Sequence, residues 1–225
     1  MTETSCRPRP NSSTIDQVNG GFVDIIIGTQ LISKGHDFPN VTLVGILAPD
    51  QGLFSVDFRA PELLFQQLVQ VSGRAGRGSE PGQVIIQTAF PENPYLAMVR
   101  DHRFQEFYQL CGEERAALGF PPFGYLAMLR AESTVRGHGL DFLAQAKNRG
   151  QEILAKSGDD NVQVMDPVAS PMEKQSGRFR AQLLVKSRSR RALGLFLEAL
   201  MSETESSPSS RRVRWSLDVD PTEMY

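Results

Sequence analysis

Three short aliphatic runs constrain the fold of this chain more than any other feature. They are FVDIIIGT at 22–29, VTLVGIL at 41–47 and QVIIQTA at 83–89. Continuous apolar runs of this length, bounded by glycine and polar turn residues, predict strands buried on both faces, as in parallel sheets. A stretch with apolar residues at helical spacing, 61–72, separates the second run from the third. This order predicts an α/β fold with a parallel sheet.

The same pattern bears on how much of a domain the chain contains. Three strands are few for a parallel sheet, and the first begins close to residue 1. Because a short piece of sheet leaves a hydrophobic edge unpaired, we expect the chain to lack the beginning of this domain. Residues 1–14, rich in Ser, Thr and Pro, are predicted to be a disordered leader. The first domain is therefore predicted over 15–114.

The second half of the chain has a different order of elements. After a helical stretch at 95–118, it alternates short apolar strands with two amphipathic helices. The strands are predicted at 125–133, 161–167, 178–187 and 213–221, and the helices at 140–156 and 190–201. The order β-α-β-β-α-β predicts a small α+β domain over 115–225, with helices on one face of its sheet.

Charge and cysteine content narrow the class of protein. The chain has 24 Lys and Arg against 26 Asp and Glu, a net charge of −2, so any nucleic-acid site has to be a local patch. Cys6 and Cys111 have no His partners at metal-ligand spacing, which favours two free thiols over a zinc site or a disulfide. No apolar run approaches the roughly 18 residues of a membrane span. We expect a soluble, cytoplasmic protein.

The sharpest chemical signal is the segment QVSGRAGR at 70–77. A guanidinium group is always charged and presents a planar fork that suits phosphate oxygens. The glycines allow a tight turn that brings Arg74 and Arg77 towards one ligand, and Gln70 lies one helical turn before Arg74. The alternative is a solvated basic helix end with Gly73 just after the last helical residue. The composition of the segment leaves both interpretations open.

A second segment, GTQLISKGHDF at 28–38, follows the first predicted strand. Loops at the carboxyl ends of parallel strands bind ligands in open α/β folds. Lys34 is a cation suited to phosphate, and Asp37 can accept a hydrogen bond from a ribose hydroxyl. Thr29 and Gln30 can both donate and accept. The alternative is an ordinary loop that leads into a helix N-cap.

Taken together, the two segments resemble motifs V and VI of superfamily-two helicases. The resemblance narrows to the PriA family (primosomal protein N-prime), the replication-restart DNA helicases of bacteria. It is carried by GTQLISKGHDFPNVTLVGIL at 28–47, DFRAPELLFQQLVQVSGRAGR at 57–77, LGFPPFGYLAMLRAE at 118–132 and VRWSLDVDP at 213–221. A different superfamily-two translocase, of the fork-reversing kind, would explain GRAGR but not the last segment. The resemblance runs from about Ile15 to the C-terminus.

The resemblance implies roles for individual residues. In that family ATP binds between two RecA-like lobes, and this chain resembles the end of the second lobe plus the C-terminal domain. Arg77 would be the arginine finger on the γ-phosphate, with Arg74 beside it and Gln70 sensing the γ-phosphate or the attacking water. The other segment would bind ATP through Asp37 and Gly35, and would couple the nucleotide to DNA through Thr29, Gln30 and Lys34.

The chain also departs from the family. It contains no GxxxxGK[ST] phosphate loop, no Asp-Glu magnesium motif after a strand, and no cysteine-rich zinc insertion. The family hydrolyses ATP with Mg²⁺ and moves 3′-to-5′ to restart stalled forks and help load the primosome. An arginine finger stabilises transition-state charge, but the phosphate loop and Mg²⁺ hold the substrate. We therefore expect no ATP hydrolysis by this chain alone, and no zinc ligands in it.

The predicted C-terminal domain carries a basic cluster. Arg178 and Arg180 lie on one face of a predicted strand, and in the family this domain contacts fork DNA and the acidic tail of single-strand-binding protein. Arg178 and Arg180 are the DNA-binding candidates. Arg190, at the start of a predicted helix whose N-terminus favours anions, is the partner-binding candidate. Lys186, Arg188 and Arg191 continue the cluster, which could alternatively be a solvated basic face.

The resemblance implies forked and single-stranded DNA, single-strand-binding protein and other primosome proteins as partners, and we expect a monomer. The missing phosphate loop and the basic cluster favour a second hypothesis, an autonomous DNA- or partner-binding module without ATPase activity. Among the remaining candidates, Trp215 is predicted to lie in the core rather than to stack on bases. Asp218 and Asp220 are predicted to be structural, paired with an arginine.

Overall fold

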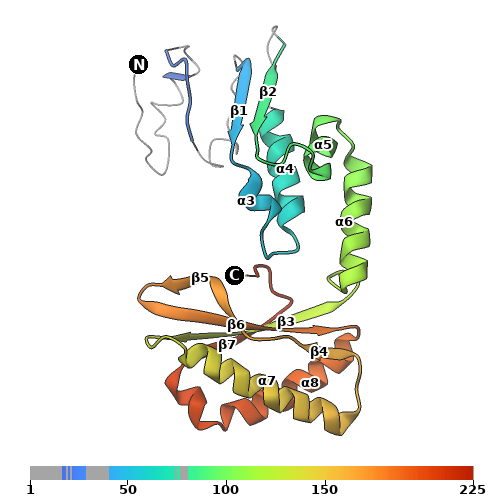
Figure 1. Cartoon of the computed structure of the whole chain (residues 1–225), viewed down its shortest axis with the longest axis vertical. Helices are drawn as coiled ribbons and strands as arrows, with labels where there is room; N and C mark the ends of the chain where they lie inside the picture. Colours follow the sequence, from blue (N-terminus) through green and yellow to red (C-terminus); the bar gives the residue numbers. More distant parts are fainter. Residues whose placement is uncertain are drawn as a thin grey trace. The chain divides into compact units, whose positions relative to one another are not determined.

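The computed structural model describes residues 17–18, 20, 22–28, 41–73, 75–76 and 81–224. The chain divides into two compact units, Met1–Gln109 and Leu110–Tyr225 (Figure 1). The first contains a parallel pair of strands and the second an antiparallel sheet of five strands. The predicted fold class, an α/β part followed by an α+β part, is confirmed.

The first unit is built on two parallel strands joined by a helical connection. β1 (Leu43–Leu47) and β2 (Gln83–Gln87) pair in parallel, with the first residues of the two strands opposite each other. The chain between them forms the short helix α3 (Asp50–Leu53) and the longer helix α4 (Ala60–Ser72). Proline near the start of α4 suits a helix N-terminus. α4 therefore carries the segment around Gln70 at its C-terminal end.

The first predicted strand, over 22–29, is wrong. Its described part, 22–28, contains no strand, and the side chains of Ile25 and Ile27 are 74% and 87% exposed. A parallel strand needs backbone hydrogen-bonding neighbours and apolar cover on its faces. In the described part of the chain, the parallel sheet consists of β1 and β2 alone. The run is apolar enough to be a buried strand, but it pairs with neither of them.

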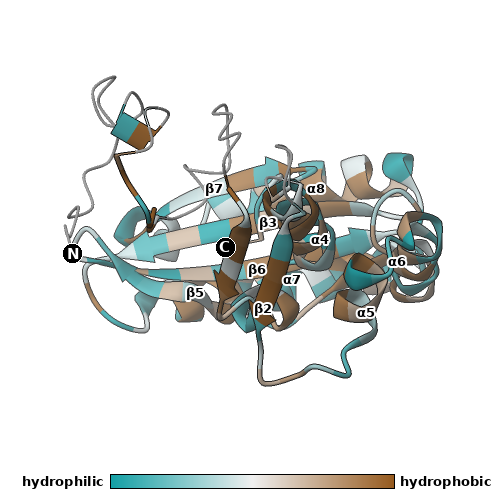
Figure 2. Cartoon of the chain, turned by 90° about the horizontal axis from the view of Figure 1, so that it is seen from above, coloured by the Kyte–Doolittle hydropathy of each residue, from teal (hydrophilic) through white to brown (hydrophobic). Residues whose placement is uncertain are grey.

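β1 and β2 are buried on one face rather than on both. Exposed and half-buried residues alternate along both strands. Val44 and Ile46 are half-buried, whereas Leu43 and Leu47 are exposed. The apolar residues of β2, brown in Figure 2, include the exposed Ile85. The prediction that both faces of these strands are buried is wrong. Apolar composition shows only which residues could be buried, whereas a strand covered on one face has alternating buried and exposed side chains.

The predicted helix over 95–118 is two helices. α5 (Pro94–Arg100) begins after Asn93, whose side chain accepts a hydrogen bond from the backbone N–H of Tyr95 at 2.9 Å. α6 (Phe104–Leu118) follows after a break of three residues. Within the break, His102 adopts a left-handed φ of 54°. A left-handed residue ends an α-helix, and the sequence around His102 has no glycine or proline to signal the break.

Aromatic packing holds α4 in place in the first unit. The ring of Phe65 on α4 stacks on Phe107 with centroids 3.8 Å apart, and meets Phe104 edge to face at 5.5 Å. Phe65 is 3% exposed and Phe107 is fully buried. Buried aromatic pairs of this kind stabilise a fold beyond the burial of their area. They fix the helix that leads into the glycine-arginine segment.

The second unit is an antiparallel sheet covered by two helices (Figure 1). Its strands are ordered β4-β6-β3-β7, with β5 also paired to β6. The elements in chain order are β3 (Tyr125–Ser133), α7 (His138–Ser157), β4 (Val162–Val164), β5 (Val168–Gln175), β6 (Arg178–Ser187), α8 (Arg190–Glu205), the 3₁₀ helix η1 (Pro208–Arg212) and β7 (Arg214–Val219). All predicted strands and helices of this half are present.

β5 was not expected from the sequence, which predicts only a turn before 178. It forms a hairpin with β6 through Ser176 and Gly177, whose φ angles are both positive at 50° and 78°. Two consecutive positive φ angles match the right-handed twist of the flanking strands. The register of β5 shifts between Ala169 and Lys174. This irregularity hides the alternation by which a strand is recognised.

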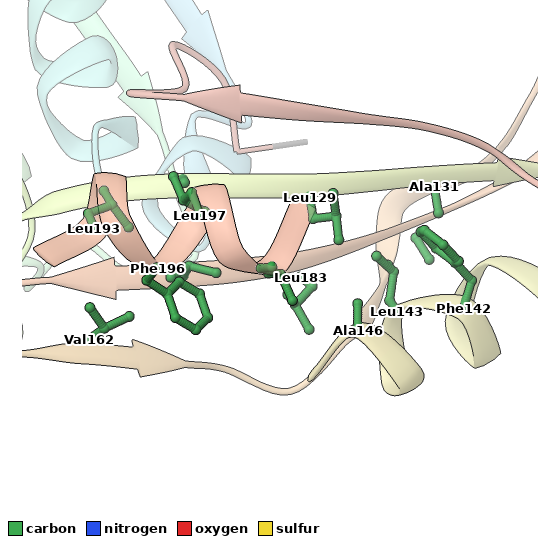
Figure 3. Close-up of a cluster of buried hydrophobic side chains, with 14 of the residues drawn as sticks. Leu129, Ala131, Phe142, Leu143, Ala146, Val162, Leu183, Leu193, Phe196 and Leu197 are labelled. Carbon is green, nitrogen blue, oxygen red and sulfur yellow. The ribbon is translucent and has the colours of Figure 1, made fainter. Parts of the chain in front are cut away.

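The core of the second unit lies between the sheet and its two helices. Alternate residues of β3 and β6, such as Leu129 and Leu183, lie in one cluster with Leu143 of α7 and Phe196 of α8, as Figure 3 shows. All four are buried. Trp215 of β7 packs against this core, with its ring 5.8 Å from that of Phe142. The prediction that Trp215 is a core residue is confirmed.

The opposite face of the sheet carries Arg130 and Gln182 beside the buried apolar residues Leu126 and Met128. There the end of the chain is held by two side chains: Arg130 Nη2 donates to the carbonyl oxygen of Glu223 at 2.6 Å, and Gln182 Nε2 donates to that of Met224 at 2.9 Å. Arg130 also lies 3.5 Å from Asp218. The predicted pairing of this carboxylate with an arginine is confirmed, and the contacts fasten the chain end across β3 and β6.

Candidate nucleotide-site loop and nucleic-acid interfaces

Helix α4 carries Gln70 in its last turn, where the residue is exposed. An exposed side chain at the end of a helix is free to reach a ligand. The residues predicted to act with it on ATP and DNA lie outside the described residues: Arg74, Arg77, Thr29, Gln30, Lys34, Gly35 and Asp37. The geometry of the site therefore comes from Gln70 and from the backbone between and beside these positions.

The backbone between Arg74 and Arg77 is fixed by two close contacts. The N–H of Gly76 donates to the carbonyl oxygen of Val41 at 3.0 Å. Gly76 has a φ of 72°, a conformation in which a side chain is strained. A Cβ on Gly82 would lie only 2.2 Å from the Gly76 nitrogen, and a Cβ on Gly76 only 2.6 Å from the Gly82 nitrogen. The two glycine backbones touch, so the turn requires glycine at both places.

These contacts lie at the amino ends of both strands. Val41 lies two residues before β1, and Gly82 directly precedes β2. Val41 is also three residues beyond the predicted segment 28–38. The Val41 carbonyl thus connects the chain just after one predicted motif to the turn of the other. Two segments far apart in the sequence therefore meet at the amino ends of the two parallel strands.

Gly73 does not end α4 in the manner of a simple helix terminus. Its φ is −67°, and its N–H donates to the carbonyl oxygen of Val69 at 2.9 Å. A glycine that terminates a helix typically adopts a left-handed conformation. Here the left-handed residue is Gly76, three positions later. A plain solvated helix end at Gly73 therefore lacks its expected geometry.

Sequence reasoning missed Asp57, which fixes the other end of α4. Asp57 is 5% exposed, and its Oδ1 accepts a hydrogen bond from the N–H of Arg59 at 2.9 Å. Its carbonyl oxygen accepts from the N–H of Ala60 at 2.9 Å. A carboxylate at this place satisfies helix donors that have no partner within the helix. The signal available in the sequence is an Asp shortly before a proline that begins a helix.

Sequence reasoning also missed Asp50, which links the two strands at their other ends. Its carboxylate accepts from the hydroxyl of Thr88 and from the N–H of Ala89, the latter at 3.0 Å. Asp50 follows β1, and Thr88 follows β2. The contact therefore lies at the carboxyl ends of the strands, away from the glycine contact. Its geometry is that of a structural clamp.

The predicted basic cluster over 178–191 is two surfaces rather than one. β6 extends over 10 residues from Arg178, which corresponds to about 30 Å at about 3.3 Å per residue. Arg178 and Arg180 lie at its beginning, and Arg190 lies beyond its end at the start of α8. Between them, Lys186 donates to the carbonyl oxygen of Leu118. Proximity in sequence does not bring these cations together, because an extended strand separates them.

Arg190 borders an apolar groove of about 370 Å³ on the second unit. The residue is exposed at the first position of α8, whose N-cap is Ser189. The hydroxyl of Ser189 accepts from the N–H of Ala192 at 3.3 Å. The groove is lined by Tyr125, Arg190, Leu193, Gly194, Leu197, Glu198, Met201, Leu217, Val219 and Asp220. The lining is mostly apolar, and its charged residues are Arg190, Glu198 and Asp220.

Two other kinds of feature are absent from the described ranges. No helix in them is both long and apolar enough to cross a membrane. They also contain no group of three or more His, Cys, Asp and Glu side chains arranged to hold a metal ion. Cys111 is buried and forms no disulfide within the described residues.

Both units match known protein families. Residues 4–79 match the helicase conserved C-terminal domain, and residues 116–222 match the primosomal protein N C-terminal domain. The chain is 36% identical over 211 residues to the replication restart protein PriA of Haemophilus influenzae. The chain corresponds to the C-terminal part of the PriA family. The resemblance identified from the sequence segments is thus confirmed.

The relatives are considerably longer than this chain. The match to Haemophilus influenzae PriA covers 93% of the chain and 28% of that relative. PriA of Bacillus subtilis is 34% identical, with 97% of the chain and 27% of the relative covered. PriA of Synechocystis is 36% identical, with 98% and 25% covered. The chain therefore spans about a quarter of the length of these PriA proteins.

Proposed function

We propose that this chain acts as the C-terminal part of an ATP-dependent 3′-to-5′ DNA helicase that restarts stalled replication forks and helps load the primosome. The observation that carries the proposal is the collinear match of both units to PriA relatives over nearly the whole chain. The tight glycine turn at Gly76 and Gly82 supports it, because it constrains the backbone of Gly76, which lies between Arg74 and Arg77 in the sequence. ATP and Mg²⁺ are the proposed cofactors.

A chimaera tests this function. Residues 15–225 replace the corresponding C-terminal part of Haemophilus influenzae PriA, whose remainder would supply the groups that hold ATP and Mg²⁺. We expect the chimaera to hydrolyse ATP when DNA is added and to unwind a forked duplex, whereas residues 1–225 alone hydrolyse none. A chimaera that folds and binds DNA but lacks DNA-stimulated ATP hydrolysis would contradict the helicase role.

We further propose that the groove beside Arg190 binds the acidic tail of single-strand-binding protein. An apolar groove accommodates apolar side chains of a peptide, and a guanidinium at its border pairs with a carboxylate. The N-terminus of α8 adds a favourable potential for an anion. The proposal rests on the groove lining and on the exposure of Arg190.

Arg190→Glu is expected to weaken binding of a labelled peptide with the sequence of that tail by about 10- to 100-fold, because the substitution removes a charge-assisted hydrogen bond. Fluorescence anisotropy with the 225-residue chain measures the change. Arg191→Glu is the matched control, because Arg191 is the next residue, carries the same charge and does not line the groove. Equal losses in both variants would mean that the peptide senses net charge only.

A second candidate function is an autonomous DNA- or partner-binding module without ATPase activity. It is favoured by exposed arginines on the second unit together with the absence of a GxxxxGK[ST] sequence in the 225 residues. The chimaera separates the two candidates, since a pure binding module would not restore ATP hydrolysis to the rest of a PriA protein.

A further inference from the structure

The antiparallel sheet gathers arginines from separate parts of the sequence at one of its ends. Glu132 of β3 is the register partner of Arg180 on β6 and of Arg214 on β7. Residues directly opposite each other on neighbouring strands point to the same face. Arg180 and Arg214 therefore flank Glu132 on one face, about 10 Å apart across two strand spacings. We call Arg178, Arg180, Arg212 and Arg214 the arginine end.

This face is the one that α7 and α8 do not cover. The neighbours of these residues along their strands, Ala131 on β3 and Ala181 on β6, belong to the core beneath the helices. Val213 also packs against that core, while Arg212 and Arg214 on either side of it are exposed. Since successive residues of a strand point to opposite faces, Arg178, Arg180 and Arg214 are presented away from the core, and Arg212, the last residue of η1, is exposed two residues before Arg214.

The ion pairs at this end leave a positive excess. Arg180 Nε lies 3.6 Å from Glu132 Oε1, and Arg136 pairs with Glu173 at 2.9 Å. These pairs engage the carboxylates of Glu132 and Glu173. Arg178, Arg212 and Arg214 have no acidic partner among the residues that the structure describes, and all three are exposed. On a chain of net charge −2, three unpaired guanidiniums in one place form a distinct cationic surface.

The position of Arg180 is fixed by neutral and charged partners. Its Nη1 donates to Gln175 Oε1 at 2.8 Å, in addition to the contact with Glu132. Gln175 is the register partner of Arg178 across the β5–β6 hairpin. The hairpin therefore holds the first two arginines together, while the pairing of β7 with β3 brings Arg214 alongside, with Arg212 of η1 two residues before it. Antiparallel pairing, rather than sequence proximity, assembles the surface.

We propose that the arginine end binds the phosphate backbone of nucleic acid, at a surface separate from the groove beside Arg190. The spread of the guanidiniums over about two strand spacings and their exposure suit a line of repeated charges better than a single small anion. Arginine also pairs with phosphate in a bidentate manner. The inference rests on the proposed DNA-binding function and adds Arg212 and Arg214, which lie more than thirty residues from Arg178 in the sequence.

The test measures how binding of duplex DNA by the 225-residue chain depends on salt. A triple variant, Arg178→Gln with Arg212→Gln and Arg214→Gln, removes three phosphate contacts. Each contact to duplex DNA contributes about 0.9 to the slope of log K against log salt concentration. We expect the slope of the variant to be shallower by about 2 to 3, as measured by anisotropy of a labelled duplex.

A control variant that loses the same number of positive charges tests whether the position of the cations matters, and not only the net charge. Lys156→Gln with Arg188→Gln and Arg191→Gln also removes three exposed cations, near the opposite end of the sheet where β4 pairs with the end of β6. Its slope is expected to equal that of the unmodified chain. Circular dichroism and thermal unfolding check that both triple variants remain folded.

The outcomes distinguish the inference from the proposed function. If the unmodified chain binds duplex DNA and both triple variants change the slope equally, or only the control does, the arginine end is not the DNA surface. If the unmodified chain does not bind duplex or single-stranded DNA at low salt, its proposed DNA-binding function fails as well. A selective change in the Arg178, Arg212 and Arg214 variant supports the proposal.

Discussion

Replacing Arg77 by alanine in the chimaeric helicase is expected to lower DNA-stimulated ATP hydrolysis by roughly 10³–10⁵-fold, the effect of an arginine finger in other nucleotide hydrolases. The finger stabilises the negative charge that develops on the phosphoryl group in the transition state. DNA binding should stay within about twofold of the unmodified chimaera, because the arginine end lies elsewhere in the chain. Steady-state phosphate release with saturating DNA measures the effect.

Two comparisons sharpen this prediction. Arg77→Lys keeps the positive charge but not the planar fork, so we expect it to recover only a small part of the activity. Arg191→Ala removes an arginine from the second unit and should leave ATP hydrolysis unchanged. Turnover by Arg77→Ala at the rate of the unmodified chimaera would exclude Arg77 as the finger.

Gly82→Ala is expected to lower ATP hydrolysis by the chimaera by about 10²-fold, although residue 82 carries no reactive group. The new Cβ would lie 2.2 Å from the Gly76 nitrogen and 2.4 Å from the carbonyl carbon of Ala75. Both atoms are backbone, so the turn between Arg74 and Arg77 must shift. Misplacement of catalytic groups by about 1 Å can reduce rates by about this factor.

Gly112→Ala is the matched control for this substitution. Gly112 lies within α6, and a Cβ there meets nothing within 4 Å. Alanine in a helix interior is favoured over glycine by about 1 kcal/mol, so the control should raise the free energy of unfolding and leave turnover unchanged. If Gly82→Ala also retained full turnover, the contact between Gly76 and Gly82 would have no part in placing the arginines.

Local sequence patterns predicted the elements of the second unit well. β3 and β6 have the predicted bounds because each is an apolar-rich run that lies between turn residues. The break at His102 escaped prediction because its positive φ occurs without a glycine or proline signal, and β5 escaped it because the shift in its register hides the alternation of a strand. Ser176 precedes Gly177 in the hairpin turn, but only the pairing with β6 shows that a strand comes before it.

Burial in the first unit could not be predicted from composition. The apolar run at 22–29 has the composition of a buried strand. Leu43, Leu47 and Ile85 are apolar, as expected of strands that are covered on both faces. Their exposure depends on which neighbouring strands and helices are available to pair and pack. Hydropathy measures the gain from burial, whereas the cover itself comes from other parts of a fold.

The sequence by itself determined the fold class, the family and the chemical character of the candidate site, because strand periodicity, glycine turns and arginine spacing are local properties of the chain. Only the tertiary structure decided which of these residues lie close together. It separated Arg178 from Arg190 by the length of β6, and joined Arg178 and Arg180 to Arg214 through β3. The physical reason is that an extended strand moves neighbours in sequence apart by about 3.3 Å per residue, while sheet pairing brings distant segments to about 4.8 Å.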